Sequence, residues 1–340
     1  MSKLRIGLLG GANIARQFTA AVAGSERLSV VSVASRSAEK AAAFAAENGI
    51  PGAHGSYEAL LADPGVDAVY VPLPNNLHTE WAIKALEAGK HVLCEKPLAL
   101  NADQVRAMFA SAEASGRFLA EGYPWRAQPR TALLSRLLAE GAIGAVKQVA
   151  VSFSAPFSDP TNIRLRPEAG GGALLDLGTY CVSFLRLVAG ARPIRVHAAA
   201  DWAETGVDRG MVATLEFSGG VLATLNCSFA AAYQRTATVH GETGGLSTSW
   251  QNHTLSAADP ILLWRGGANV VAAEALEAPA ADGFRAEAES FAAAVAEGPA
   301  AWSGATAAES LDIALTLDAL AASARTGAGV DLPRDRGEPA

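Results

Sequence analysis

Residues 4–15 read Leu-Arg-Ile-Gly-Leu-Leu-Gly-Gly-Ala-Asn-Ile-Ala, an apolar run followed at once by a turn of small residues. The turn has the spacing G-x-G-x-x-A, with alanine at the second glycine position. The first glycine permits a tight turn, a small second residue lets backbone amides approach a pyrophosphate, and a small third residue lets the next helix pack on the strand. The spacing predicts a dinucleotide phosphate site, against the alternative of a strand–helix turn that binds no nucleotide. The residues of this predicted site are Gly10, Gly11, Ala12, Asn13 and Ile14.

Around this turn the first third of the chain alternates between short apolar strands and helices. Strands are predicted at residues 4–9, 28–34, 68–71, 91–94 and 118–120. Helices are predicted at residues 14–23, 38–48, 77–88 and 101–115. This alternation indicates βαβ units and a parallel sheet.

The pattern changes after about residue 145, where strands follow one another at residues 148–154, 195–200, 212–217, 221–229 and 236–240. Such a succession is typical of a largely antiparallel sheet. Helical pattern returns at residues 284–296 and 307–324. We therefore expect an α/β chain with two domains. Residues 1–122 would form a Rossmann domain with a doubly wound parallel sheet, and residues 123–340 an α+β domain with an open, mostly antiparallel sheet.

Composition excludes several classes of partner. The chain has 340 residues, half of them apolar, and 27 basic against 34 acidic side chains give a formal net charge of −7. An acidic chain without a basic run offers no electrostatic attraction to nucleic acid. No apolar stretch approaches the roughly 18 residues that suggest a membrane span. The N-terminus lacks the pattern of a signal peptide, so we expect a cytoplasmic protein with no nucleic-acid or membrane partner.

Cysteine and histidine usage predicts no metal site. Three cysteines show no C-x-x-C spacing, which fits a reducing compartment and no structural zinc; they are Cys94, Cys181 and Cys227. Five histidines share no ligand spacing with one another or with a cysteine; they are His54, His91, His197, His240 and His253.

The end of the second predicted strand bears on cofactor choice. An acidic residue there would bind a ribose 2′-hydroxyl. The chain instead has Ser35 and Arg36, with Lys40 one turn further on. A guanidinium can pair with a 2′-phosphate and stack on adenine, so the sequence favours NADP(H), with NAD(H) possible. The alternatives are that Arg36 is an ordinary exposed arginine, or that it stacks on adenine without selecting between the cofactors.

Three further stretches are more specific than the glycine turn. Residues 67–78 read Asp-Ala-Val-Tyr-Val-Pro-Leu-Pro-Asn-Asn-Leu-His, and residues 89–97 read Gly-Lys-His-Val-Leu-Cys-Glu-Lys-Pro. Residues 170–180 read Gly-Gly-Gly-Ala-Leu-Leu-Asp-Leu-Gly-Thr-Tyr. Together they resemble the Gfo/Idh/MocA oxidoreductase family. The tyrosine at the end of the third stretch is similar to the branch that contains glucose–fructose oxidoreductase, dihydrodiol dehydrogenase and NADP-dependent xylose dehydrogenase.

The resemblance implies hydride transfer between a nicotinamide cofactor and a hydroxyl or carbonyl group of a cyclic sugar or related polyol. It makes Tyr180 the general acid and base, and Lys96 its electrostatic partner. A tyrosine with its usual pKa of about 10 is a poor base at neutral pH, and an adjacent ammonium would lower that pKa. Asp176 would hold Lys96 or a sugar hydroxyl. The alternatives are a tyrosine that closes the core and a surface lysine after a strand. A catalytically inactive nicotinamide-binding sensor of the same fold is the second functional hypothesis.

The resemblance also implies a set of residues around the cofactor, and a homodimer or homotetramer formed through the C-terminal sheet. His78 could instead satisfy nearby backbone, while the Glu-Lys-Pro bend of the family can contain a cis peptide. The residues implied to lie around the cofactor are Pro72, Leu73, Asn75, His78, Glu95, Lys96, Trp125, Arg126 and Arg164.

The chain departs from the family pattern at three positions. Ala12 replaces a glycine, Ile163 stands where many relatives carry tryptophan, and Gln128 stands where the family has histidine. Exchanging one small residue for another in the turn is tolerable. The other two changes alter the expected walls of the cofactor and substrate sites.

Overall fold

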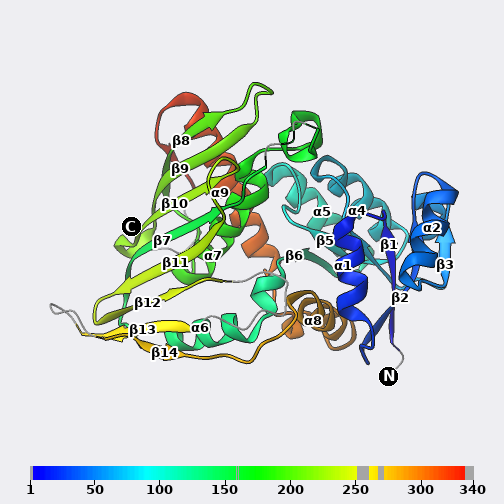
Figure 1. Ribbon diagram of the computed structural model, residues 1–340, viewed down its shortest axis with the longest axis horizontal. Helices are drawn as coiled ribbons and strands as arrows, with labels where there is room; N and C mark the ends of the chain where they lie inside the picture. Colours follow the sequence, from blue (N-terminus) through cyan, green and yellow to red (C-terminus); the bar gives the residue numbers. More distant parts are fainter. Residues whose placement is uncertain (1–2, 158, 160, 251–259, 267–271, 334–340) are drawn as a thin grey trace. The chain divides into compact units, whose positions relative to one another are not determined.

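The computed structural model describes residues 3–157, 159, 161–250, 260–266 and 272–333 (Figure 1). The chain divides into two compact units. The first comprises Met1–Ala99, Asp103–Gln128 and Ala281–Ala307, and the second comprises Leu100–Ala102, Pro129–Ala280 and Ala308–Ala340.

The first unit is built on a parallel sheet whose described strands have the order β3-β2-β1-β4-β5-β6. Its strands are β1 (Leu4–Leu9), β2 (Leu28–Ala34), β3 (Gly52–His54), β4 (Ala68–Val71), β5 (His91–Glu95) and β6 (Leu119–Gly122). The connecting helices are α1 (Asn13–Val22), α2 (Ala38–Asn48), α3 (Tyr57–Leu61), α4 (His78–Glu87) and α5 (Ala102–Ser115). This is the strand order of doubly wound dinucleotide-binding sheets, so the predicted Rossmann architecture is confirmed.

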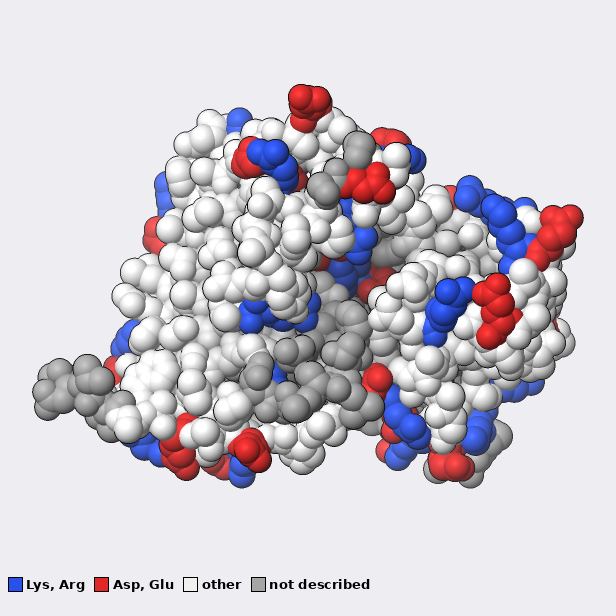
Figure 2. Space-filling view, in the orientation of Figure 1, with Lys and Arg blue, Asp and Glu red and all other residues white. Residues whose placement is uncertain are grey.

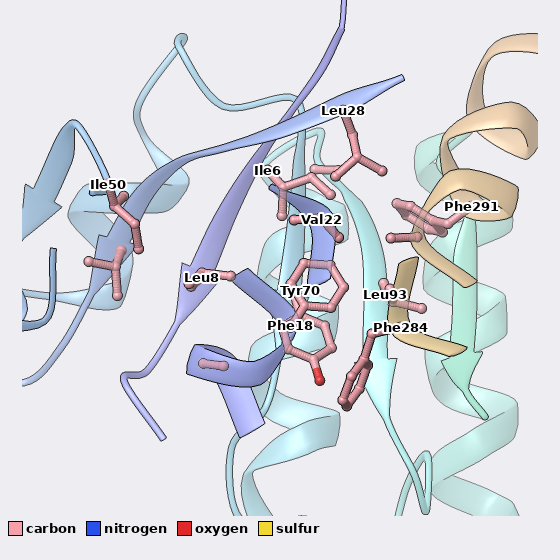
Figure 3. Close-up of a cluster of buried hydrophobic side chains, with 14 of the residues drawn as sticks. Ile6, Leu8, Phe18, Val22, Leu28, Ile50, Tyr70, Leu93, Phe284 and Phe291 are labelled. Carbon is pink, nitrogen blue, oxygen red and sulfur yellow. The ribbon is translucent and has the colours of Figure 1, made fainter. Parts of the chain in front are cut away.

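Helix α8 (Gly283–Glu297) joins this unit from the far end of the chain. Its buried Phe284 and Phe291 lie in the same apolar cluster as Phe18 and Tyr70 (Figure 3). The rings of Phe18 and Tyr70 stack with their centres 4.1 Å apart. The predicted boundary assigned this helix to the C-terminal domain, and the compact units differ from it here. An amphipathic pattern shows that a helix buries one face, but not which sheet covers that face.

The second unit is built on a mixed sheet with the order β14-β13-β12-β11-β7-β10-β9-β8-β15. β7 and β10 pair in parallel, and the remaining pairs are antiparallel, as the sequence predicts. Its longer strands are β7 (Val146–Ser154), β8 (Arg195–Trp202), β9 (Asp208–Glu216), β10 (Leu222–Ser228) and β11 (Gln234–Gly241). The shorter strands are β12 (Gly244–Thr248), β13 (Ile261–Arg265), β14 (Glu274–Leu276) and β15 (Val330–Asp331).

Helices of the second unit are α6 (Pro129–Ala139), α7 (Thr179–Ala189) and α9 (Ala307–Thr326). A π-helical turn at Leu174–Gly178 leads directly into α7, which packs on β7 and β10. The helical run at residues 167–189 is long and apolar enough to cross a membrane by composition. However, 72% of its most apolar window is buried within the protein, so packing on the sheet accounts for that composition.

The sheet of the second unit also has an exposed face. Residues of β9 and β10 alternate between buried and exposed positions, as expected for strands with one face on the core. Val212 and Leu222 are 63% and 52% exposed on these strands. In Figure 2 the surface over β7, β9 and β10 is mainly uncharged.

Candidate active site

The predicted cofactor residues of the first unit follow the carboxyl ends of its parallel strands. The glycine turn follows β1, Arg36 follows β2, Leu73 follows β4, and Lys96 follows β5. Since the strands are parallel, these ends share one edge of the sheet. The strand order reverses between β1 and β4, and ligands of such sheets bind at this point.

The glycine turn is shaped as a backbone cradle. Gly10 has φ +105°, a conformation that side chains disfavour. A Cβ atom on Gly10 would lie 3.1 Å from Leu73 Cδ2, and one on Gly11 would lie 2.8 Å from Phe44 Cδ2. Ala12 is the N-cap of α1 and offers no side-chain acceptor to the amides of the first helical turn. Amides at a helix N-terminus favour phosphate, so these residues fit the pyrophosphate of a dinucleotide.

The turn after β2 presents positive charge to solvent. Arg36 and Lys40 are exposed, and no described residue forms an ion pair with Arg36. Ser37 caps α2 by accepting a hydrogen bond from the Lys40 backbone amide at 3.3 Å. Burial raises the pKa of the nearby Tyr57, and the charge of Arg36 opposes that rise. Tyr57 Oη lies 3.8 Å from where a Cβ of Gly10 would stand, a proximity that no local sequence pattern indicates.

His78, which the resemblance implies to lie beside the cofactor, is enclosed between two turns of the first unit. Its ring is fully buried, with Nδ1 2.8 Å from the Pro97 carbonyl oxygen and Nε2 2.8 Å from the Leu73 carbonyl oxygen. Burial lowers its pKa. A neutral imidazole has one N–H, so the ring donates to one of these two carbonyl groups and lies between the turn after β4 and the turn after β5. Its position beside the cofactor stays a prediction.

The Glu-Lys-Pro bend contains a cis peptide between Lys96 and Pro97, as the resemblance implies. Glu95 is buried, and its Oε1 accepts a 2.6 Å hydrogen bond from the Tyr70 hydroxyl. Its Oε2 accepts a 3.3 Å hydrogen bond from the Lys96 backbone amide. Glu95 thus has a structural role in this bend, while the side chain of Lys96 is half-buried.

Glu287 of α8 adds a second buried carboxyl group close to Glu95. A Cβ on Gly122 would lie 3.6 Å from Glu95 Cα and 3.7 Å from Glu287 Oε2. The pKa of Glu287 is held well above its ordinary value, first by burial and then by the charge of Glu95. Sequence reasoning missed Glu287 because α8 lies far from β5 in the chain.

Trp125 and Arg126 follow β6 in a short 3-10 turn (Pro124–Ala127). Both are buried, and the Arg126 guanidinium carbon lies 5.7 Å from the centre of the Trp125 ring. Gln128, which replaces the family's histidine, is buried as well. Burial restricts the side chains of all three residues, but it does not test their predicted contacts with a cofactor or substrate.

In the second unit, the glycine run before α7 packs closely against the Arg164 backbone and the Asp208 carboxyl group. A Cβ on Gly171 would lie 2.5 Å from the Arg164 carbonyl oxygen, and one on Gly172 would meet a carboxyl oxygen of Asp208. Asp208 Oδ2 accepts a 2.6 Å hydrogen bond from the Leu174 amide. This carboxyl group from β9 anchors the start of the helix that carries Asp176 and Tyr180.

Asp176 lies in the π-helical turn, and its Oδ2 accepts a 2.6 Å hydrogen bond from Arg164 Nε. This ion pair positions Arg164, whose guanidinium carbon also lies 4.6 Å from the centre of the Phe157 ring. The predicted interaction of Asp176 with Lys96 joins the two units and stays a prediction. Ile163, at the position of the family's tryptophan, is exposed.

Tyr180 lies in the first turn of α7 and is 5% exposed. Its ring centre lies 5.5 Å from that of Phe153 on β7 and 6.1 Å from that of Trp250. The guanidinium carbon of Arg235 lies 5.4 Å from the Tyr180 ring centre. Sequence analysis did not identify Arg235 or Trp250, because only the pairing of distant strands brings them beside Tyr180.

Metal ligation has no candidate in the part of the chain that the structure describes. No group of three or more histidine, cysteine, aspartate and glutamate side chains is arranged there to hold an ion. His253, one of the histidines considered above, lies outside the described residues.

Comparison with known proteins assigns the chain to a family. Residues 4–123 match an oxidoreductase family with an NAD-binding Rossmann fold, and residues 131–247 match the GFO/IDH/MocA C-terminal domain. The chain belongs to the Gfo/Idh/MocA oxidoreductase family. It is accordingly an NAD(P)-dependent oxidoreductase, and the family that the sequence motifs suggest is confirmed.

Several relatives in the Gfo/Idh/MocA family are named for their activities. The chain is 38% identical over 332 residues to D-xylose 1-dehydrogenase (NADP(+)) 2 of Haloferax volcanii, and the aligned region covers 97% of this chain and 100% of that protein. It is 39% identical over 244 residues to trans-1,2-dihydrobenzene-1,2-diol dehydrogenase of Danio rerio, covering 71% and 73% of the two chains.

Solved structures of Gfo/Idh/MocA proteins resemble this chain over nearly its whole length. A 3-ketoreductase from Actinomadura kijaniata, in complex with NADP and TDP-benzene, has a TM-score of 0.85 and 34% identity and covers 95% of this chain and 98% of its own. An aldose–aldose oxidoreductase from Caulobacter crescentus has a TM-score of 0.88 and 26% identity, covering 97% and 100% of the two chains.

Proposed function

We propose that this oxidoreductase uses NADP(H) to interconvert a hydroxyl and a carbonyl group on a cyclic sugar or related polyol. The observation that carries the proposal is the shared edge of the parallel sheet, where the backbone cradle, Arg36 and Lys96 follow β1, β2 and β5. The activities of the xylose dehydrogenase, the ketoreductase and the aldose–aldose oxidoreductase support the substrate class.

The residues fit a dinucleotide in the following way. Gly10, Gly11 and the first turn of α1 would bind the pyrophosphate through backbone amides. Arg36 would pair with the 2′-phosphate, which favours NADP(H). The NADP named for the xylose dehydrogenase and for the ketoreductase complex supports this preference. When bound, the nicotinamide ring accepts the hydride from a substrate carbon or returns it.

Tyr180 is the proposed general acid and base. In the oxidative direction its oxygen takes the proton of the substrate hydroxyl as the C–H electron pair leaves the carbon, so that a carbonyl forms. In the reductive direction the phenol donates this proton to the carbonyl oxygen. The ammonium of Lys96 favours the phenolate and binds the substrate oxygen, while Asp176 holds Lys96 or a sugar hydroxyl.

Replacement Tyr180→Phe tests this assignment. Loss of general acid–base catalysis predicts a fall in turnover of about 10²–10⁴-fold. The affinity for NADPH should stay nearly unchanged. Turnover is followed by nicotinamide absorbance with a panel of aldoses, ketoses and polyols. Full activity of the variant would assign the proton transfer to another group. Binding of NADPH by the wild type without turnover on any member of the panel would favour the sensor hypothesis.

Location and assembly are also part of the proposal. The structure describes Cys94, Cys181 and Cys227 as free and buried, which supports a cytoplasmic enzyme. A homodimer or homotetramer formed through the exposed face of the C-terminal sheet would cover Val212 and Leu222, whose exposure supports such an interface.

A further inference from the structure

Three aromatic rings of the second unit surround one guanidinium. The guanidinium carbon of Arg235 lies 3.8 Å from the ring centre of Phe153, 5.1 Å from that of Trp250 and 5.4 Å from that of Tyr180. We call Phe153, Tyr180 and Trp250 the aromatic cage. Arg235 of β11 and Phe153 of β7 are direct partners across the antiparallel ladder, so their side chains share the face of the sheet that α7 covers.

Arg235 is an unusual cation because its side chain is partly buried, with a buried Nε atom, and has no carboxylate partner among the described residues. No ion pair joins it to any described residue, and its Nε atom has no hydrogen-bond partner there. Burial accordingly lowers its pKa, while the nearby tyrosines act in the opposite direction. Burying an unpaired charge is costly, and contacts with ring faces recover only part of that cost. The site therefore favours a negative charge close to the guanidinium.

Among the described residues, only one neighbour of Arg235 is suited to supply that charge during the reaction. The described titratable groups that act on it are Tyr180 and Cys181 from α7, Asp176 from the π-helical turn, and Tyr233 just before β11. The Asp176 carboxylate is paired with Arg164 at 2.6 Å. Burial raises the pKa of Cys181, which therefore stays a neutral thiol, and Tyr233 is largely exposed to solvent.

We propose that Arg235 is a positioning residue for the reaction, whose partly buried guanidinium stabilises the negative charge on the Tyr180 oxygen and fixes the Tyr180 ring within the aromatic cage. This inference rests on the proposed role of Tyr180. Arg235 would be a second cation acting on Tyr180, in addition to Lys96, and it belongs to the same unit as Tyr180. Tyr180 would thus have a permanent positive neighbour within its own unit.

A titration of Tyr180 tests the interaction without measuring activity. The chain has five tyrosines, so the difference in ultraviolet phenolate absorbance between the wild type and Tyr180→Phe reports Tyr180 alone. The same difference is then recorded in an Arg235→Met background, which removes the charge but keeps an apolar stem in the cage. We expect the midpoint of Tyr180 to rise by at least about one pH unit, since loss of a nearby opposite charge disfavours the phenolate.

Two matched variants complete the comparison. Arg235→Lys keeps the positive charge and should retain most of the wild-type midpoint. Arg136→Met removes an exposed arginine from α6 of the same unit and should leave the midpoint unchanged. If Arg235→Met does not fold, as judged by circular dichroism, Arg235→Gln provides the same comparison with a planar neutral side chain.

The pH profile of sugar oxidation gives a second readout. Removal of the charge should move the alkaline rise of kcat/KM to higher pH by the same interval, and kcat at neutral pH should fall about tenfold for each unit. NADPH affinity should not change. A folded Arg235→Met or Arg235→Gln protein with the wild-type Tyr180 midpoint would overturn the inference, as would an equal shift in Arg235→Lys. Should Tyr180→Phe keep full turnover, the proposed function fails, while the titration still decides the interaction between Arg235 and Tyr180.

Discussion

Arg36 is the residue on which cofactor preference depends in our proposal. It is exposed at the carboxyl end of β2 and is not neutralised by an ion pair with any described residue. Replacement Arg36→Ala should weaken NADPH binding by about tenfold or more, because a charge-assisted hydrogen bond contributes about 1.5–3 kcal/mol. NADH binding should change much less. Titration calorimetry with both nucleotides measures the two losses, and Arg106→Ala on the exposed side of α5 is the control. Equal losses would mean that Arg36 only stacks on adenine.

Among single residues, the sequence predicts those whose position follows from a local motif. Gly10 and Arg36 follow strands that a short apolar run predicts, and the structure gives them the expected places after β1 and β2. Arg235, Asp208 and Glu287 were missed because each reaches its neighbours through strand pairing or a returning helix. For His78 the motif implies a place beside the cofactor, which stays a prediction, and it does not reveal that the ring lies between two backbone carbonyl groups.

At the scale of the secondary-structure element, Asp208 makes the start of the α7 region depend on pH. Burial raises the pKa of Asp208 from 3.8 to about 6, so between these pH values the folded chain binds more protons than the unfolded chain. Its contribution is fully present below pH 3.8 and is lost as the pH rises towards 6 and beyond. The free energy of unfolding should fall by about 2–3 kcal/mol across this interval.

Replacement Asp208→Asn tests this dependence. The amide oxygen can still accept the hydrogen bond from the Leu174 amide, while the ionisation is removed. Both Asp208→Asn and Asp208→Ala should lack the fall in stability with pH. Asp208→Ala should be less stable than Asp208→Asn by about 1 kcal/mol at every pH, because it also lacks the hydrogen bond to the Leu174 amide. Urea unfolding from pH 4 to pH 8 provides the measurement. Asp201→Asn, an exposed carboxylate on β8, is the control. If the free energy of unfolding of Asp208→Asn fell with pH as much as that of the wild type, the pH dependence would belong to other groups.

At the same scale, hydrophobic periodicity predicted most of the long elements, although not the eleven-residue helix α6, and missed the short ones. The predicted strands at residues 4–9, 28–34 and 68–71 have the bounds of β1, β2 and β4. β3, β14 and β15 have only two or three residues each, too few to show a period. The π-helical turn before α7 also left no sequence signal, because it arises where Asp208 and the glycine run fix the helix start.

At the scale of the whole molecule, each unit illustrates a different limit of local reasoning. Alternating strands and helices predict a parallel sheet, and the predicted class of both sheets is confirmed. The return of α8 to the first unit was not predicted, because its apolar face fits any open sheet face equally well by pattern. The packing of rings such as Phe284 and Phe291 decides which sheet α8 covers, and this packing depends on the fold as a whole.

The proposed assembly belongs to this scale too, since it would use the exposed face of the C-terminal sheet. Val212 of β9 is flanked across the ladders by Ala199 and Asn226, which leaves an uncharged strip centred on an exposed valine. Covering such a strip favours association of two copies through the hydrophobic effect.

Val212→Glu would place two like charges near each other in a symmetric interface, so it should shift the wild-type oligomer to monomers. Sedimentation velocity at micromolar concentration measures the mass. Ile163→Glu alters a similarly exposed apolar side chain outside the sheet and should keep the oligomer. A monomeric wild type, or an unchanged mass for Val212→Glu, would show that copies do not meet through this face.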